Sequence, residues 1–180
     1  MLRTKVLDAA EKLILEKGTD ALRVEDVAAL AGVSKGGLLH HFRSKHALIE
    51  GVLRRQVDTF EKVLPPEGAP PGAFTMAWLA AAVPESEPEA GGQRDQVSVA
   101  LLSAISGGDE TLEILREKYT EWQRRLASDG LDPTVATLVR FAADGWWTSR
   151  ILKLAQPTEN LYLDLRRTLV EMIETAAGKE

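Results

Sequence analysis

Three histidines, His40, His41 and His46, are the side chains of this sequence best suited to acid–base or metal chemistry. Adjacent residues of a helix point about 100° apart, and no cysteine is present to complete a set of ligands. Histidine, the commonest general base, is absent after His46, and no glycine-rich phosphate loop follows a strand. The sequence therefore predicts no metal site, no catalytic residue, no cofactor and no enzyme.

Basic side chains in the same region predict contact with a polyanion instead. Residues 1–48 hold 8 Lys and Arg against 6 Asp and Glu, whereas residues 49–180 hold 14 against 21. Charge asymmetry between segments is a hint of polyanion contact, and the alternative is a chance fluctuation, because a difference of a few charges over 48 residues is common. The net charge of -5 alone argues against nucleic-acid binding. Lys35, Arg43 and Lys45 supply the candidate cations.

The elements that must position these cations are helices, because apolar residues recur at helical spacing and no strand alternation appears. Gly18 and Gly32 are stop signals, and Ser34 and Ser44 are good N-caps. A connector rich in proline and glycine follows at residues 65–72. The predicted helices cover about residues 2–17, 24–31, 34–41, 44–64, 73–83, 92–106, 110–128, 132–155 and 157–177.

The second and third predicted helices form a helix-turn-helix unit, whose second helix enters a major groove of DNA. Ala28 is small where the helices cross, and Gly32 supplies the turn. A compact helical hairpin unrelated to DNA is the alternative. The predicted DNA-binding residues are Arg23, Ser34, Lys35, Gly36, Gly37, Leu39, His40 and Lys45.

The order of residues in this unit resembles a known family. The stretches Val24-Glu-Asp-Val-Ala28, Ala31-Gly-Val-Ser-Lys-Gly36, Leu38 and His40-His-Phe-Arg-Ser-Lys45 resemble the N-terminal DNA-binding domain of TetR-type (TetR/AcrR) transcriptional regulators. The resemblance implies an all-α homodimer with an N-terminal three-helix DNA-binding domain and a larger helical domain for ligand binding and dimerisation. About nine predicted helices agree with that architecture.

The sequence departs from the family pattern at a few positions. Leu22 and Arg23 stand where relatives often have Thr or Ser, so a side-chain N-cap is missing and Arg23 is free to contact phosphate. Leu39 and His41 stand where tyrosines are frequent, and His46 replaces a common glutamate. These differences affect the operator sequence rather than the mode of binding.

Aromatic residues of the second domain suggest an effector pocket, since pockets between helices are mostly apolar with a few polar groups. Aromatic side chains more often fill a core, and an exposed carboxylate is the alternative for Asp144. An inward Asp144 would favour cationic compounds. The predicted ligand-binding residues are Trp78, Trp122, Phe141, Asp144 and Trp147.

The two last predicted helices each carry an apolar face that could pair with its copy across a two-fold axis. The alternative is burial of both faces within one subunit. The faces consist of Leu138, Phe141, Ala142, Gly145, Ser149 and Leu152, and of Leu161, Leu165, Leu169, Met172 and Ala176.

The sequence thus predicts a ligand-responsive transcriptional repressor that binds a palindromic DNA operator as a homodimer and is released by a small apolar effector. Residues 1–48 form the predicted DNA-binding domain and residues 49–180 the predicted ligand-binding and dimerisation domain. A helical protein-interaction module without DNA binding is the alternative function. No stretch approaches the ~20 apolar residues of a membrane span, so we expect a cytoplasmic protein with no membrane partner.

Overall fold

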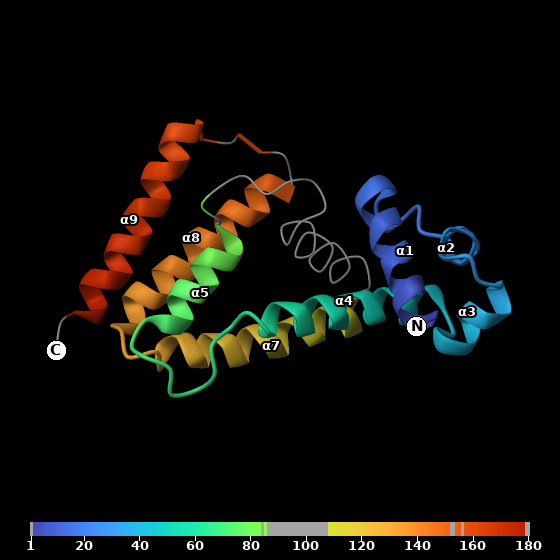
Figure 1. The fold of residues 1–180 in the computed structure, drawn as a ribbon, viewed down its shortest axis with the longest axis horizontal. Helices are drawn as coiled ribbons and strands as arrows, with labels where there is room; N and C mark the ends of the chain where they lie inside the picture. The colour runs from blue at the N-terminus through green and yellow to red at the C-terminus, as the bar shows by residue number, and fades with distance from the viewer. Residues whose placement is uncertain (1, 84, 86–107, 152–153, 156, 179–180) are drawn as a thin grey trace. The chain divides into compact units, whose positions relative to one another are not determined.

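The computed structural model describes residues 2–83, 85, 108–151, 154–155 and 157–178. Every helix or strand in these ranges is an α-helix, which confirms the predicted all-α class (Figure 1). The helices are α1 (Leu2–Lys17), α2 (Val24–Ala31), α3 (Lys35–His41), α4 (Lys45–Glu61), α5 (Ala73–Ala82), α7 (Asp109–Ala127), α8 (Pro133–Ile151) and α9 (Glu159–Ala177).

For the helices that the structure describes, the predicted boundaries agree with the observed ones within three residues except at the C-terminal end of α8. The helix predicted over residues 132–155 ends at Ile151 as α8, and Leu154 and Ala155 are not helical. The Leu154 N–H donates to the Ser149 carbonyl at 2.8 Å, five residues back, which closes the end of the helix. The helix predicted over residues 92–106 lies outside the described residues, as does Leu152.

The chain divides into two compact units. The N-terminal unit comprises Met1–Thr59 with Ala90–Glu117, and the second unit comprises Phe60–Glu89 with Lys118–Glu180. Helix α4 carries residues of both units, because its last two residues are counted in the second.

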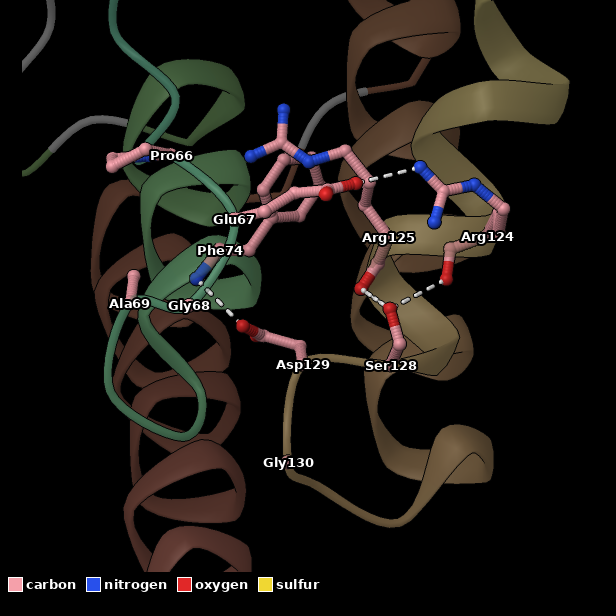
Figure 2. Close-up of a pocket in the computed structure, with 10 residues that line it drawn as sticks. All are labelled: Pro66, Glu67, Gly68, Ala69, Phe74, Arg124, Arg125, Ser128, Asp129 and Gly130. Atoms are coloured by element: carbon pink, nitrogen blue, oxygen red, sulfur yellow. Dashed lines mark hydrogen bonds and ion pairs between the residues drawn. The ribbon is translucent and has the colours of Figure 1, made fainter.

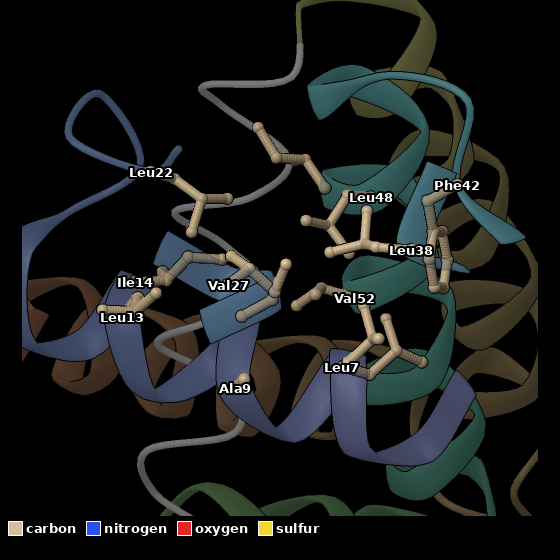
Figure 3. Packing of buried hydrophobic residues seen from close by; sticks show 14 residues of the cluster. Leu7, Ala9, Leu13, Ile14, Leu22, Val27, Leu38, Phe42, Leu48 and Val52 are labelled. Carbon is tan, nitrogen blue, oxygen red and sulfur yellow. The ribbon is translucent and has the colours of Figure 1, made fainter. Parts of the chain in front are cut away.

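The N-terminal unit has a continuous apolar core built from α1, α2, α3 and the first half of α4 (Figure 3). Leu7 and Ile14 of α1 lie within it, together with Val27 of α2, Leu38 of α3 and Val52 of α4, each no more than 1% exposed. Burying such side chains stabilises a fold by about 1.5–3 kcal/mol each. Helix α3 is therefore fixed on a rigid base.

A polar network also joins α1 to α4 within this unit. Arg55 donates to Asp8 at 2.7 Å and to Glu11 at 2.7 Å, and the Gln56 amide donates to the same Glu11 carboxylate. Burial raises the pKa of Glu11, against the opposing influence of Arg55 and Gln56. The pairing satisfies polar groups that would otherwise be costly beside an apolar core.

The second unit packs α5 against α8 and α9. Helix α5 has no cap of its own, since Gly72 at its N-cap has no side chain. Asp129, from the loop after α7, replaces that cap by accepting from the Phe74 and Thr75 N–H groups at 3.1 and 2.8 Å and from the Thr75 hydroxyl at 2.8 Å. The start of α5 is thus held by a residue more than fifty positions away.

Apolar side chains remain exposed on the last two helices of this unit. Leu138 and Phe141 of α8 are 50% and 59% exposed, and Leu161 and Leu165 of α9 are 50% and 49% exposed. One of the two alternatives for these faces was burial within one subunit. These four side chains are exposed instead. Among the described helices, none is long and apolar enough to cross a membrane.

Candidate nucleic-acid interface and effector site

The helix-turn-helix unit consists of α2, the turn at Gly32 and α3. Arg23 precedes α2 in an extended conformation and makes no side-chain cap hydrogen bond, as the sequence predicted. Gly32 has a φ of 65°, a left-handed conformation that glycine adopts without a steric penalty. The following Val33 N–H donates to the Ala28 carbonyl at 2.9 Å, so the turn closes directly onto α2.

Ser34 fixes the start of α3. Its hydroxyl accepts from the Gly37 N–H at 3.0 Å, which confirms the predicted N-cap. Ser44 does the same for α4 by accepting from the Ala47 N–H at 3.0 Å. Since the Ser34 hydroxyl is engaged within α3, contact between Ser34 and DNA stays a prediction.

The predicted DNA-binding residues of α3 lie on its outer side, opposite the buried Leu38. Lys35, Gly36 and His40 are exposed, whereas Gly37 and Leu39 are half-buried. A methyl group added at Gly36 would meet no heavy atom within 4 Å, so the backbone there is open to close approach. The structure therefore gathers these five residues on one accessible surface next to the turn.

The two predicted lysines already have partners in the free chain, and neither partner was predicted from the sequence. The Lys35 ammonium lies 2.6 Å from the Glu25 carboxylate of α2. The Lys45 ammonium donates to the Asp20 carbonyl at 3.1 Å. Opposite charges at Glu25 and Lys35, on either side of the turn, are the sequence signal that could have indicated the first of these pairs.

Among the described residues, no group of three His, Cys, Asp or Glu side chains is placed to hold a metal ion. The His40 and His41 rings meet edge to face at 5.4 Å between centroids. His46 instead faces Glu110 of α7, with 3.4 Å between Nε2 and the carboxylate.

Trp78 and Trp122, predicted to bind an effector, lie in a dense aromatic cluster of the second unit. They are 2% and 3% exposed, and their ring centroids are 5.4 Å apart. Tyr119 lies 5.8 Å from Trp78, and Phe60, at the end of α4, lies 5.1 Å from Trp78 and 5.2 Å from Trp122. Edge-to-face pairs at these distances are typical of a packed core.

Asp144 lies beside this cluster, turned toward it rather than into solvent. It accepts from the Tyr119 hydroxyl at 3.4 Å and pairs with Arg140 at 3.4 Å. Burial raises the pKa of Asp144 to about 6, despite the opposing influence of Arg140 and of the Tyr119 and Trp78 side chains. Its charge thus already has an internal cation.

The other two predicted effector residues, Phe141 and Trp147, differ in exposure. Phe141 is 59% exposed, and its ring faces the Arg140 guanidinium at 4.4 Å. Trp147 is 8% exposed and makes no ring contact with Trp78 or Trp122 among the described residues. The structure brings Trp78, Trp122 and Asp144 together and leaves Phe141 outside.

Two hollows open on the described surface of the second unit, and neither is lined by a predicted effector residue. One, of about 330 Å³, lies between the 66–69 connector and the end of α7. There the Arg125 guanidinium stacks 4.1 Å from the Phe74 ring and Arg124 pairs with Glu67 at 2.7 Å (Figure 2). The other, of about 510 Å³, lies between the start of α8 and the end of α9.

Two family models match this chain. Residues 6–52 match the model described as bacterial regulatory proteins, tetR family, and residues 72–174 match the model described as tetracyclin repressor-like, C-terminal domain. The second match alone covers more than half of the 180 residues.

Related proteins match over the N-terminal region. The HTH-type transcriptional repressor KstR2 of Rhodococcus jostii (strain RHA1) is 43% identical over 56 residues, 31% of this chain and 28% of that protein. The HTH-type transcriptional regulator RutR of Escherichia coli (strain K12) is 41% identical over 64 residues, 31% of this chain and 30% of that protein. The matches thus span less than a third of these relatives' length.

Solved structures resemble the fold along nearly its whole length. A transcriptional regulator from Rhodococcus sp. Rha1 superposes with a TM-score of 0.73 at 22% identity, covering 97% of this chain and 95% of that one. The multidrug binding protein EbrR complexed with ethidium gives a TM-score of 0.64 at 24% identity, covering 96% and 99%. At such identities the likeness shows the fold.

Proposed function

The chain belongs to the tetR family of bacterial regulatory proteins, and we propose that it is a repressor that binds a palindromic DNA operator as a homodimer and leaves it when a small apolar effector binds. Its relatives are transcriptional regulators, not enzymes. DNA as partner implies a cytoplasmic protein. We place the DNA-binding domain at residues 1–48 and the ligand-binding and dimerisation domain at 49–180.

The observation that carries this proposal is the exposed face of α3. A recognition helix contacts base edges with residues near its N-terminus, and here Lys35 is the first residue of α3, followed by the open backbone of Gly36. Lys45, at the start of α4, supplies a second cation near the turn. Arg23, before α2, supplies a third.

Selection of bound duplexes from a random pool tests the proposal, followed by affinity measurements from 50 to 200 mM salt. Replacing Lys35 and Lys45 by Ala is expected to weaken operator binding and to reduce the log–log salt slope by about one for each of the two lysines that contacts a phosphate. The matched control replaces Lys12 and Lys62, which removes the same charge away from α3. If the wild type selects no duplex, the interaction-module alternative holds.

Dimerisation is supported by the exposed apolar side chains of α8 and α9. Leu161 and Leu165 are one helical turn apart, and each is about half exposed. Leu165→Asp is expected to split the dimer, because an unpaired charge in an apolar interface costs several kcal/mol. Sedimentation measures the result, with Leu15→Asp on α1 as the control. A dimeric Leu165→Asp variant would place the two-fold axis elsewhere.

Release by an effector is supported by the position of Phe60. This residue of α4 packs on Trp78 and Trp122, while Leu48 and Val52 of the same helix belong to the N-terminal core. A ligand that separates these rings would displace Phe60 and with it α4. Such a ligand shifts the equilibrium only if it binds the released form more tightly.

The pairing of Asp144 with Arg140 favours a neutral effector over a cation, since the carboxylate is already matched. The neutral probe N-phenyl-1-naphthylamine is therefore expected to quench tryptophan fluorescence and lower operator affinity more than ethidium does. Trp147→Ala is expected to weaken this response and leave unliganded DNA binding intact. Trp146→Ala, whose ring stacks on Tyr162 instead, is the control. No response to either probe would argue for a purely structural cluster.

A further inference from the structure

Lys35 is held by a carboxylate before any DNA arrives. Its ammonium lies 2.6 Å from Glu25, and the two side chains are 57% and 59% exposed. Glu25 lies in the first turn of α2, and Lys35 is the first residue of α3, so the pair crosses the helix-turn-helix turn. The ion pair is thus part of the surface that faces the operator in the proposed function.

The charges around the pair are unevenly placed. The Lys35 ammonium holds the pKa of the Glu25 carboxyl below its ordinary value, with a smaller contribution from Arg23. Asp26 follows directly in the same turn of α2 and has no polar partner among the described residues. The adjacent carboxylates of Glu25 and Asp26 therefore differ in their contact with Lys35, which only Glu25 makes among the described residues.

An ammonium group has three donors, so Lys35 can keep its bond to Glu25 and still offer two donors to DNA. A phosphate bound there would bring its negative charge close to the Glu25 carboxylate, and the two would repel each other. The guanine O6 and N7 atoms accept hydrogen bonds without carrying a formal charge. A base edge therefore satisfies Lys35 at a lower electrostatic cost than a phosphate does.

We propose that Glu25 is a positioning and specificity-determining residue, which orients Lys35 and keeps it for a guanine edge rather than for the phosphate backbone. This inference rests on the proposed DNA binding. In it Glu25 touches no base itself and acts through Lys35. Loss of Glu25 frees Lys35 for any phosphate, which strengthens binding to all sequences and reduces the distinction between them.

The test compares Glu25→Gln with Asp26→Asn, which remove the same charge from the same helical turn. Affinities are measured for the operator selected by the wild type and for a random duplex, from 50 to 200 mM salt. Glu25→Gln is expected to steepen the random-duplex slope by about one, which is a fourfold change over this salt range. Asp26→Asn is expected to strengthen both complexes alike and leave the operator-to-random ratio unchanged.

A second substitution shows whether the effect passes through Lys35. Adding Lys35→Gln to Glu25→Gln is expected to restore the wild-type slope for the random duplex, whereas a structural role of Glu25 would leave the slope unaffected by Lys35. The inference is overturned if Glu25→Gln and Asp26→Asn change the operator-to-random ratio equally. Failure of the wild type to bind any duplex would instead overturn the proposed function, so the two failures are distinguishable.

Discussion

The helix-turn-helix unit and the aromatic cluster place their distinctive residues in opposite environments. Lys35, Gly36 and His40 lie exposed on a helix that is held from behind by Leu38, whereas Trp78 and Trp122 are almost completely buried against each other. A residue that is exposed on a rigid base can be changed without loss of packing. Substitutions in the first region are therefore expected to change DNA binding without changing stability. Substitutions in the aromatic cluster are expected to change stability together with any ligand binding.

The largest expected effect is the loss of a ring from the cluster. Trp122→Ala is expected to lower the free energy of unfolding by about 3–5 kcal/mol, the usual cost of removing a large buried aromatic. Trp122→Phe, which keeps a ring against Phe60 and Tyr119, is the matched control and should cost clearly less. Urea unfolding measures both.

The counterpart in the first region is Lys35→Ala, which should leave the urea midpoint unchanged and weaken DNA binding. A Trp122→Ala variant that unfolds at the wild-type urea concentration would break the comparison. In that case the Trp122 ring of the wild type would line a ligand site without contributing to the core.

The next effect concerns the remote cap of α5. Asp129→Ala removes acceptors from two N–H groups and one hydroxyl that are partly buried, and is expected to cost about 2–3 kcal/mol. Asp132, which accepts from the nearby Thr134 N–H at 2.8 Å at the exposed start of α8, provides the control, and its loss should cost about 1 kcal/mol. Equal losses in urea unfolding would mean that the Asp129 contacts add nothing beyond a local cap.

The helix caps also show which contacts the sequence could predict. The Ser34 and Ser44 caps and the Gly32 turn lie within a few residues of the groups they satisfy, so local spacing was enough to place α3 and α4. The Asp129 cap joins residues 54 positions apart, and no local pattern points to it. The helices were thus predictable, whereas the contacts between distant helices were not.

The candidate sites also differ in how far the sequence could predict them. The outward face of α3 followed from one helical period, because a short helix with Leu38 inside must turn Lys35 and His40 outside. The type of residue did not distinguish Phe141, which is exposed, from Trp122, which is buried, since both lie at helical spacing on apolar faces. Only the partners across the bundle decide which of them is core.

A third prediction compares two half-buried carboxyls, Glu11 in the N-terminal unit and Asp144 in the second. Burial raises the pKa of both, that of Asp144 to about 6 from an ordinary value of 3.8. Between pH 3.8 and about pH 6, the Asp144 carboxyl is therefore mostly protonated in the folded state and mostly ionised in the unfolded state. The Asp144 contribution to stability is therefore full at low pH and is lost as the pH rises from about 4 to 6.

Asp144→Asn should remove this contribution while leaving that of Glu11 in place. The difference in unfolding free energy between variant and wild type is expected to change by about 2 kcal/mol between pH 4 and pH 7, in favour of the variant as the pH rises. Urea unfolding at a series of pH values gives this difference. Parallel curves for the two proteins would show that Asp144 is solvated like an exposed carboxyl.

The last comparison of stability concerns two glycines of the N-terminal unit. A methyl group at Gly51 of α4 would lie 2.6 Å from the Phe42 ring. Because Phe42 is buried at the end of α3, Gly51→Ala is expected to cost about 1–3 kcal/mol through overpacking. It should also weaken operator binding, since α3 moves with Phe42.

Gly36→Ala is expected to increase stability, whereas Gly51→Ala decreases it. Its methyl group meets no atom of the chain, and alanine in a helix is favoured over glycine by about 1 kcal/mol, so the free energy of unfolding should rise. If the DNA backbone or a base approaches this position closely, operator affinity should nevertheless fall. Urea unfolding and operator binding, measured on the same preparation, decide the point. A variant that gains stability and keeps full affinity would show that Gly36 does not face DNA and that α3 enters the groove with another edge.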